Sequence, residues 1–472
     1  MIDTPKARAP RPILITLAAA TLTASLGISV ASVLLPTLTR SFSATVSDVQ
    51  WVVLAYLVSI TVAIVSAGRL GDLFGHRRVL NLGLVIFAAA SALSATAPNL
   101  SLLITGRALQ GLAGAILVAL PMSLARDLVP EERIGTAMGL LGTTSAAGTA
   151  LGPSLGGFLL TWGDWRMAFW LLTGFASVTL VLSITSISRV SARGNTTLRD
   201  LDCPGTFLLM IALAAYALAT SGEAAAIPIS PAVLISGALA AITLFVIVET
   251  RVAAPLVPFA LLSNRTTGIA FIMNLLVGTV MMSTLVVGPF FLAFSLGLNE
   301  ALIGLVMAVG PVVGALFGIP AGRLTDRLGA RRVMVIGLVQ TVLGLLCLAF
   351  LPRYLGVGGY VAALISLTPA FQLFLAANNT AVLADASKEQ RGRLSGLLGL
   401  SRNLGLMTGA SVMSTLFVTV LGTGNVEQAM PTDVAHAFSM TFVAASGLAL
   451  ITLGLAAYSH AGRSREAPGP AG

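Results

Sequence analysis

Charged residues are scarce in this sequence. Only 10% of its 472 residues are Asp, Glu, Lys or Arg, whereas a soluble domain carries about 25%. Because 56% of the residues are apolar, the surroundings of most of the chain are expected to be lipid. The two cysteines, Cys203 and Cys347, lie far apart and form no CxxC or Cys/His pattern. This spacing argues against a disulfide framework and a cysteine-based metal site.

Histidine is rarer still, and the few histidines stand apart from one another. The chain has only His76, His436 and His460, and no His, Cys or carboxylate cluster shows catalytic spacing. We therefore expect no enzyme activity, no cofactor and no metal. The net charge of +9 comes from Lys and Arg in short clusters between apolar runs. Such clusters are typical of signals that orient membrane helices, so no nucleic-acid partner is expected.

Apolar runs long enough to cross a bilayer recur along the whole chain. A membrane-spanning helix needs about 20 apolar residues, and short polar connections separate these runs. The first run is longer than the roughly 7–15 residues of a secretory signal, so it is expected to remain as a span. The sequence predicts an all-α integral membrane protein with fourteen spans. Their expected limits are 13–35, 49–68, 79–97, 100–125, 135–160, 167–188, 204–221, 231–248, 267–295, 301–321, 333–351, 357–384, 394–421 and 436–458.

The distribution of basic residues predicts how these spans are oriented. If the N-terminus is cytoplasmic, 22 of the 27 Lys and Arg residues fall in cytoplasmic segments. Cytoplasmic loops are expected to carry this excess. Only Arg40, Arg166 and Arg353 lie outside, and two arginines, Arg107 and Arg402, lie within spans. We therefore expect a multi-pass protein of the cell inner membrane with both termini in the cytoplasm.

An internal repeat divides the chain into two similar parts. The connection at 68–78 reads GRLGDLFGHRR, and the one at 322–332 reads GRLTDRLGARR, with seven of eleven positions identical. A GLLG echo pairs 139–142 with 396–399. Two parallel six-span bundles are typical of secondary transporters whose substrate site lies between the halves. The expected divisions are an N-terminal tail (1–12), a first bundle (13–188), an inserted pair of helices with flanking loops (189–265), a second bundle (266–458) and a C-terminal tail (459–472).

Three motifs resemble those of the major facilitator superfamily, and within it the fourteen-span drug:proton antiporter family. The segment 68–78 is similar to the GxLaDrxGrkx(R/K) loop, RALQGLAG at 107–114 to RxxQGxgaa, and GTALGPSLGG at 148–157 to the antiporter motif gxxxGPxxGG. The resemblance implies the major facilitator fold with fourteen helices arranged 6+2+6. It also implies a secondary active transporter that exports small lipophilic drugs or metabolites by alternating access, driven by the proton gradient.

The resemblance assigns the loop motif to a conformational latch. In such a latch the carboxylate of Asp72 docks on the N-terminal end of span thirteen, where free amides carry a partial positive charge. The alternative is a solvated turn whose charges only orient the helices. The residues assigned to the latch are Gly68, Arg69, Gly71, Asp72, Gly75, Arg77, Arg78, Asp326 and Arg331.

The other two motifs concern coupling and helix packing. An intramembrane charge such as Arg107 is costly enough to need a polar partner or cavity. The resemblance implies a role in proton coupling for it, and the alternative is a structural hydrogen-bond hub. The coupling candidates are Arg107, Gln110 and Asp48.

The antiporter-type motif should form a helix that packs closely and bends. Its residues are Gly148, Gly152, Pro153, Gly156 and Gly157.

The sequence departs from related drug antiporters in the first span. Those proteins often carry an LDxTIVNVALP-like motif, whereas residues 26–36 read LGISVASVLLP, with Gly27 in place of the acidic residue. None of the eighteen acidic residues lies near the centre of a predicted span. A lipophilic dication would lack a counter-charge there, so a neutral or weakly anionic apolar substrate is favoured. The polar residues expected to line the cavity are Ser25, Ser29, Ser32, Asn274, Gln372, Asn378, Asn379 and Arg402.

Two other transport functions remain open from the sequence. An uptake carrier for a small metabolite would share the fold, and an exporter of a lipid or cell-envelope precursor would suit a cavity poor in acidic residues. The expected partners are the small-molecule substrate, protons as coupling ion and the lipid bilayer, and we expect the protein to function as a monomer.

Overall fold

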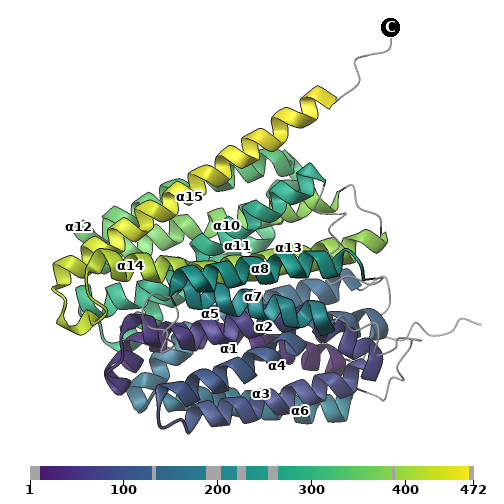
Figure 1. Ribbon diagram of the computed structural model, residues 1–472, viewed down its shortest axis with the longest axis horizontal. Helices are drawn as coiled ribbons and strands as arrows, with labels where there is room; N and C mark the ends of the chain where they lie inside the picture. The colour runs from purple at the N-terminus through teal and green to yellow at the C-terminus, as the bar shows by residue number, and fades with distance from the viewer. Residues whose placement is uncertain are drawn as a thin grey trace, which may run out of the picture. The chain divides into compact units, whose positions relative to one another are not determined.

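The computed structural model describes residues 11–129, 134–187, 203–220, 230–252, 264–384 and 388–466. These ranges are helical with short turns between them, and they contain no β-strand (Figure 1). The first helices are α1 (Arg11–Phe42), α2 (Val46–Phe74), α3 (His76–Ala95), α4 (Leu100–Leu128), α5 (Ile134–Trp162), α6 (Arg166–Ser186), α7 (Cys203–Thr220) and α8 (Pro231–Glu249). The later ones are α10 (Arg265–Phe290), η4 (Phe291–Ser295), α11 (Glu300–Leu328), α12 (Ala330–Leu383), α13 (Lys388–Thr408), η5 (Gly409–Met413), α14 (Ser414–Leu421), η6 (Val426–Gln428) and α15 (Pro431–Glu466).

Many of these helices are long and apolar enough to cross a membrane. The described ranges contain eleven such helices, and α7 is a shorter apolar helix. Helix α12 has 54 residues, and Gly356 in its interior has the non-helical angles φ 54 and ψ −132. At 1.5 Å per residue this length is sufficient for two crossings of a hydrocarbon core about 30 Å thick. The total of fourteen spans stays a prediction.

Internal contacts divide the chain into two units. The first unit contains α1, most of α2, α3 to α6, most of α7, and α8 from residue 232. The second contains α10 to α15, together with residues 44–50 and 217–220. Most of the inserted pair of helices, α7 and α8, therefore groups with the first bundle.

The same close helix packing occurs in each unit. In the first unit α1 packs on α5, and in the second α10 packs on α13 and η5. Gly148 of α5 lies so near α1 that an added Cβ would be 2.7 Å from the Cβ of Ser25. Gly405 of α13 lies against the backbone of Leu275 on α10 in the same way. Small residues let two helices approach closely inside a membrane, so the repeat seen in the sequence is also a repeat of packing.

The two copies of the loop motif share one backbone feature. Gly75 before α3 has φ 91, and Gly329 before α12 has φ 82. This left-handed region favours glycine, because a Cβ would be strained there. The glycine in each copy thus allows the sharp turn between two long helices.

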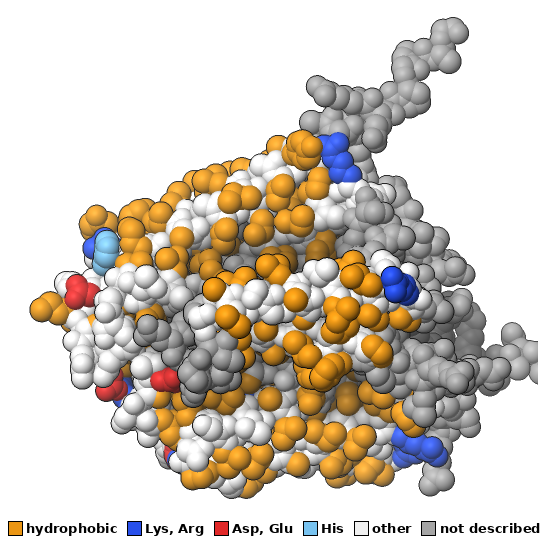
Figure 2. Space-filling model, viewed as in Figure 1, with side chains coloured by type: hydrophobic (Ala, Val, Ile, Leu, Met, Phe, Trp, Pro, Cys, Tyr) orange, Lys and Arg blue, Asp and Glu red, His pale blue; other side chains and the backbone are white. Residues whose placement is uncertain are grey.

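Hydrophobic side chains cover the visible surface of several helices, including α8, while the coloured charged groups lie toward helix ends (Figure 2). On α8, Val233 is 59% exposed and Leu239 60%. Leu316 of α11 is 70% exposed. Apolar surface of this extent along a helix is stable in lipid and unfavourable in water. These faces are therefore lipid-facing in a membrane protein.

Candidate functional site

A buried polar network centred on Arg107 crosses the first unit. Arg107 lies on α4 and is 0% exposed. Its Nε donates to the carbonyl oxygen of Val52 on α2 at 2.8 Å, and its Nη1 donates to Oε1 of Gln110 one turn along the same helix. Gln110, also 0% exposed, donates from Nε2 to Oγ of Ser91 on α3 at 2.7 Å. The network thus joins three helices.

The aromatic ring of Tyr56 supports the guanidinium group. The Cζ of Arg107 lies 4.4 Å from the ring centroid, a geometry typical of a cation–π contact. The hydroxyl of Tyr56 donates to the carbonyl oxygen of Ala24 on α1 at 3.1 Å. Gly111 and Gly114 lie directly against Tyr56, and an added Cβ on either would clash with it. The two glycines of the RALQGLAG motif therefore make room for the tyrosine.

Arg107 is a buried cation whose contacts are all neutral. Its Nη2 is buried and has no hydrogen-bond partner, and none of its hydrogen bonds goes to a carboxylate within the described ranges. A buried charge without a partner of opposite sign is costly.

Asp48, a coupling candidate, caps a helix. Its Oδ2 accepts from the backbone nitrogen of Thr45 at 3.0 Å and from the Thr45 hydroxyl at 2.7 Å. The backbone nitrogen of Asp48 donates in return to Thr45 Oγ1 at 3.2 Å. This reciprocal pattern is a capping box at the start of α2. The carboxylate therefore has a local structural role.

The loop motif is partly within the described structure. Arg77 donates from Nη2 to the carbonyl oxygen of Ile184 near the end of α6, at 2.8 Å. Gly71 packs against the ring of His76 and the side chain of Leu120. A Cβ added to Gly68 would meet no atom within 4 Å. The side chains of Arg78, Asp326 and Arg331 are exposed. The side chains of Arg69 and Asp72 lie outside the described residues, so the latch assigned to Asp72 stays a prediction.

A polar contact that was not predicted from the sequence lies beside this loop. Nδ1 of His76, the first residue of α3, lies 2.8 Å from Oδ2 of Asp127 in the last turn of α4. The nearest sequence signal is the position of His76 directly after the turn glycine of the loop motif. The pair fastens the loop to the end of α4.

The serines of α1 are used in helix packing. Ser25 Oγ lies 2.9 Å from Oγ of Ser145 on α5, and Ser29 donates to the carbonyl oxygen of Gly148 at 3.2 Å. Ser32 donates to the carbonyl oxygen of Ser29 at 2.7 Å. All three serines are buried, so the structure places these expected cavity residues within the bundle, with Ser25 and Ser29 in the contact with α5.

The antiporter-type motif forms the other side of the same contact. Gly148, Gly152 and Gly156 face α1, where a Cβ on any of them would clash. Pro153 lies inside α5 and is buried, as is Gly157. The motif therefore acts first as a tight packing surface between α5 and α1.

The remaining cavity candidates lie in the second unit and differ in exposure. Asn274 on α10 and Asn378 on α12 are buried, at 2% and 0% exposed. Gln372 is half-buried against Gly314 of α11. Asn379 and Arg402 are exposed. The structure thus brings only the two asparagines fully inside this unit.

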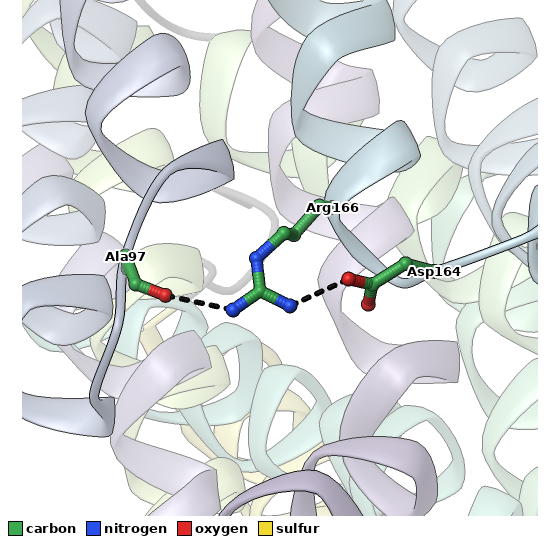
Figure 3. A network of polar contacts seen from close by, with 3 residues as sticks. All are labelled: Ala97, Asp164 and Arg166. Carbon is green, nitrogen blue, oxygen red and sulfur yellow. Dashed lines mark hydrogen bonds and ion pairs between the residues drawn. The ribbon is translucent and has the colours of Figure 1, made fainter.

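A second polar network fixes a turn of the first unit (Figure 3). Arg166 at the start of α6 donates from Nη1 to Oδ2 of Asp164 at 2.5 Å and from Nη2 to the carbonyl oxygen of Ala97 at 3.1 Å. Its guanidinium lies 4.4 Å from the ring centroid of the buried Trp165. These contacts connect the α3–α4 turn with the start of α6.

Comparison with known proteins identifies the family of this chain. A family model described as Major Facilitator Superfamily matches residues 17–290 and 269–472. The chain belongs to the major facilitator superfamily. It is therefore a multi-pass membrane protein of a superfamily of secondary transporters.

Individual relatives carry different transport names. The riboflavin transporter RibZ of Clostridioides difficile is 26% identical over 83% of this chain and 85% of its own length. The multidrug resistance protein Stp of Mycobacterium tuberculosis is 27% identical over 86% of this chain and 76% of its own length. A solved bacterial homologue of the human lysosomal transporter Spinster, inward-facing, shares the fold with a TM-score of 0.70, 14% identity, and coverage of 97% and 98%.

Proposed function

We propose that this protein exports small lipophilic compounds that are neutral or weakly anionic, by alternating access driven by the proton gradient. The observation that carries the proposal is the fully buried Arg107 with only neutral partners. A permanent cation approaching this bundle would meet a positive charge that no carboxylate balances, and the repulsion is strong at low dielectric. Similarity to the multidrug resistance protein Stp supports drug-like compounds as substrates.

The remaining parts of the proposal concern coupling and movement. We assign proton coupling to the group formed by Arg107 and Gln110, because it is the most deeply buried charged network among the described residues of the first unit. The loop motif, with Asp72 as its carboxylate, acts as the latch. The chain works as a monomer with fourteen spans, in a 6+2+6 order, in the inner membrane.

Similarity to the riboflavin transporter RibZ supports a second candidate, a carrier for a small polar or aromatic metabolite. Export and uptake differ in the direction of net flux, so one experiment separates them. A cell that expresses an exporter accumulates less of the compound than a control cell, and a cell that expresses an uptake carrier accumulates more.

The test is an accumulation screen in a bacterial strain that lacks its own exporters. The panel holds neutral lipophilic compounds, lipophilic weak acids, quaternary ammonium compounds and riboflavin, each measured with and without a proton uncoupler. We expect reduced accumulation of neutral and weakly acidic compounds and loss of this effect with the uncoupler. Selective export of quaternary ammonium compounds would contradict the substrate class, and export insensitive to the uncoupler would contradict proton coupling.

A further inference from the structure

Two buried amide oxygens in the second unit have no hydrogen-bond partner among the described residues. They are Oδ1 of Asn274 on α10 and Oδ1 of Asn378 on α12, in side chains that are 2% and 0% exposed. Buried polar atoms are nearly always paired, and an unpaired one indicates a missing water or ion. Two such oxygens in one helical bundle therefore need an explanation.

The amide nitrogens of both side chains are engaged, which orients the oxygens. Asn274 donates from Nδ2 to the carbonyl oxygen of Leu398 on α13 at 2.7 Å. Asn378 donates from Nδ2 to the carbonyl oxygen of Ala270 on α10 at 3.4 Å. Ala270 and Asn274 are one turn apart on the same face of α10. Asn378 therefore contacts the turn of α10 that carries Asn274.

Further oxygens surround the same turn. Ser401 of α13 donates its hydroxyl to the carbonyl oxygen of Phe271 at 2.5 Å, so a hydroxyl oxygen also lies at this turn of α10. The hydrogen bonds described here involve no carboxylate. Neutral oxygen atoms from carbonyls and amides are the ligands with which membrane proteins hold monovalent cations.

The first unit shows that helix packing does not require these amides. Gly148 of α5 lies against the carbonyl oxygen of Leu22 on α1, and Gly405 of α13 lies against that of Leu275 on α10. Leu22 and Leu275 therefore correspond, and Asn274 corresponds to Thr21. The hydroxyl of Thr21 donates to the carbonyl oxygen of Leu17 on its own helix at 3.1 Å, so it is fully paired. The unpaired amide is a special feature of the second unit.

We propose that the amide oxygens of Asn274 and Asn378, with the hydroxyl of Ser401, form a binding site for a small monovalent cation, with sodium as the ion tested. Arg402, the next residue after Ser401, is the nearest positive charge in the sequence, and its side chain is exposed. Its charge weakens cation binding. The site is separate from the proton-coupling group proposed in the first unit, so sodium binding is tested independently of proton-driven export.

Binding is tested on the purified full chain in detergent, independently of transport. Thermal unfolding is measured in sodium, potassium or choline chloride at equal ionic strength, and equilibrium binding is measured with radioactive sodium. We expect saturable sodium binding and a midpoint raised by about 2 °C or more in sodium alone. Equal midpoints in the three salts with no saturable binding would overturn the site and indicate that a water fills it.

Variants locate the site. Asn274→Ala and Asn378→Ala should each weaken sodium binding by about tenfold or more, whereas Gln340→Ala is the matched control. Gln340 is an amide of the same unit that donates from Nε2 to the carbonyl oxygen of Ser366 at 2.9 Å. Sodium affinity unchanged in both asparagine variants would overturn the assignment.

Two further variants keep the test decisive if the alanine variants do not fold. Asn378→Asp adds a negative charge and should tighten sodium binding, and Arg402→Gln removes a nearby positive charge and should do the same. Weaker binding in both would contradict a cation site. Failure of the efflux screen with sodium binding intact would contradict the proposed export and leave the site standing.

Discussion

Arg107 shows how a single positive charge is held inside a helical bundle without a carboxylate. Two oxygen acceptors, Val52 O and Gln110 Oε1, and the face of Tyr56 surround its guanidinium. The planar fork of arginine suits this arrangement, because separate nitrogens point to separate acceptors. A lysine ammonium is a point charge and cannot contact the same set at once.

Arg107→Lys is therefore expected to keep the charge and to transport more slowly. We expect the initial rate of efflux per mole of protein to fall by about tenfold, equivalent to about 1.4 kcal/mol. The rate is measured in cells with equal amounts of protein in the membrane. Arg353→Lys, at an exposed position, is the control and should transport at the normal rate. A fully active Arg107→Lys variant would show that only the charge matters.

Asp48 differs from Arg107 because its partners lie in its own turn of helix. Asp48→Ala removes the capping box with Thr45, so the midpoint of thermal unfolding should fall, corresponding to a loss of about 1 kcal/mol. Efflux per folded molecule should stay unchanged. Loss of proton-driven efflux at normal stability would assign the coupling role to this carboxylate after all.

At the scale of helices, the contact of α1 with α5 decides the shape of the first unit. Gly148, Gly152 and Gly156 remove side chains from one face of α5, and serines of α1 fill the contact with hydroxyls that bond across it. The second unit repeats the arrangement with Gly405 and Gly409 against α10. At each of these glycines, the close contact depends on the absence of a Cβ methyl group.

Gly152→Ala is expected to destabilise the protein, because its Cβ would overlap the hydroxyl of Ser29 and the backbone of Val30. Overpacking of this kind costs about 1–3 kcal/mol, and a lower unfolding midpoint in detergent should report it. Gly142→Ala on the same helix is the matched control, since an added Cβ there meets no atom within 4 Å. Equal midpoints for the two variants would contradict the packing described for α5.

At the scale of the whole molecule, the number of crossings determines where the ends lie. An even number of spans places both termini on one side, and the positive-inside rule predicts the cytoplasm. Reporter fusions at residue 1 and residue 472, one active only in the cytoplasm and one only outside it, should both report cytoplasm. A reporter active outside at one end alone would refute the even count, and reporters active outside at both ends would refute the orientation.

Features that depend on composition and on local sequence pattern were predicted correctly from the sequence. A chain so poor in charge must place its helices in lipid, and the segments at 68–78 and 322–332 revealed the repeat and the family. The positions where a polar or charged side chain is energetically costly in a membrane span were also visible in the sequence, because Arg107 and Asn274 interrupt apolar runs. Arg107 and Gln110 were both coupling candidates, but their hydrogen bond was not predicted, although residues three apart are neighbours on a helix.

Only the tertiary structure decided which way each helix turns its polar residues. Ser25, Ser29 and Ser32 share a face in the sequence, but contact with α5 decides what that face meets. Tyr56 carries no signal in the sequence, and its place under Arg107 depends on how α2 and α4 cross. Rotation of a helix about its axis is set by the neighbours it packs against, which lie far away along the chain.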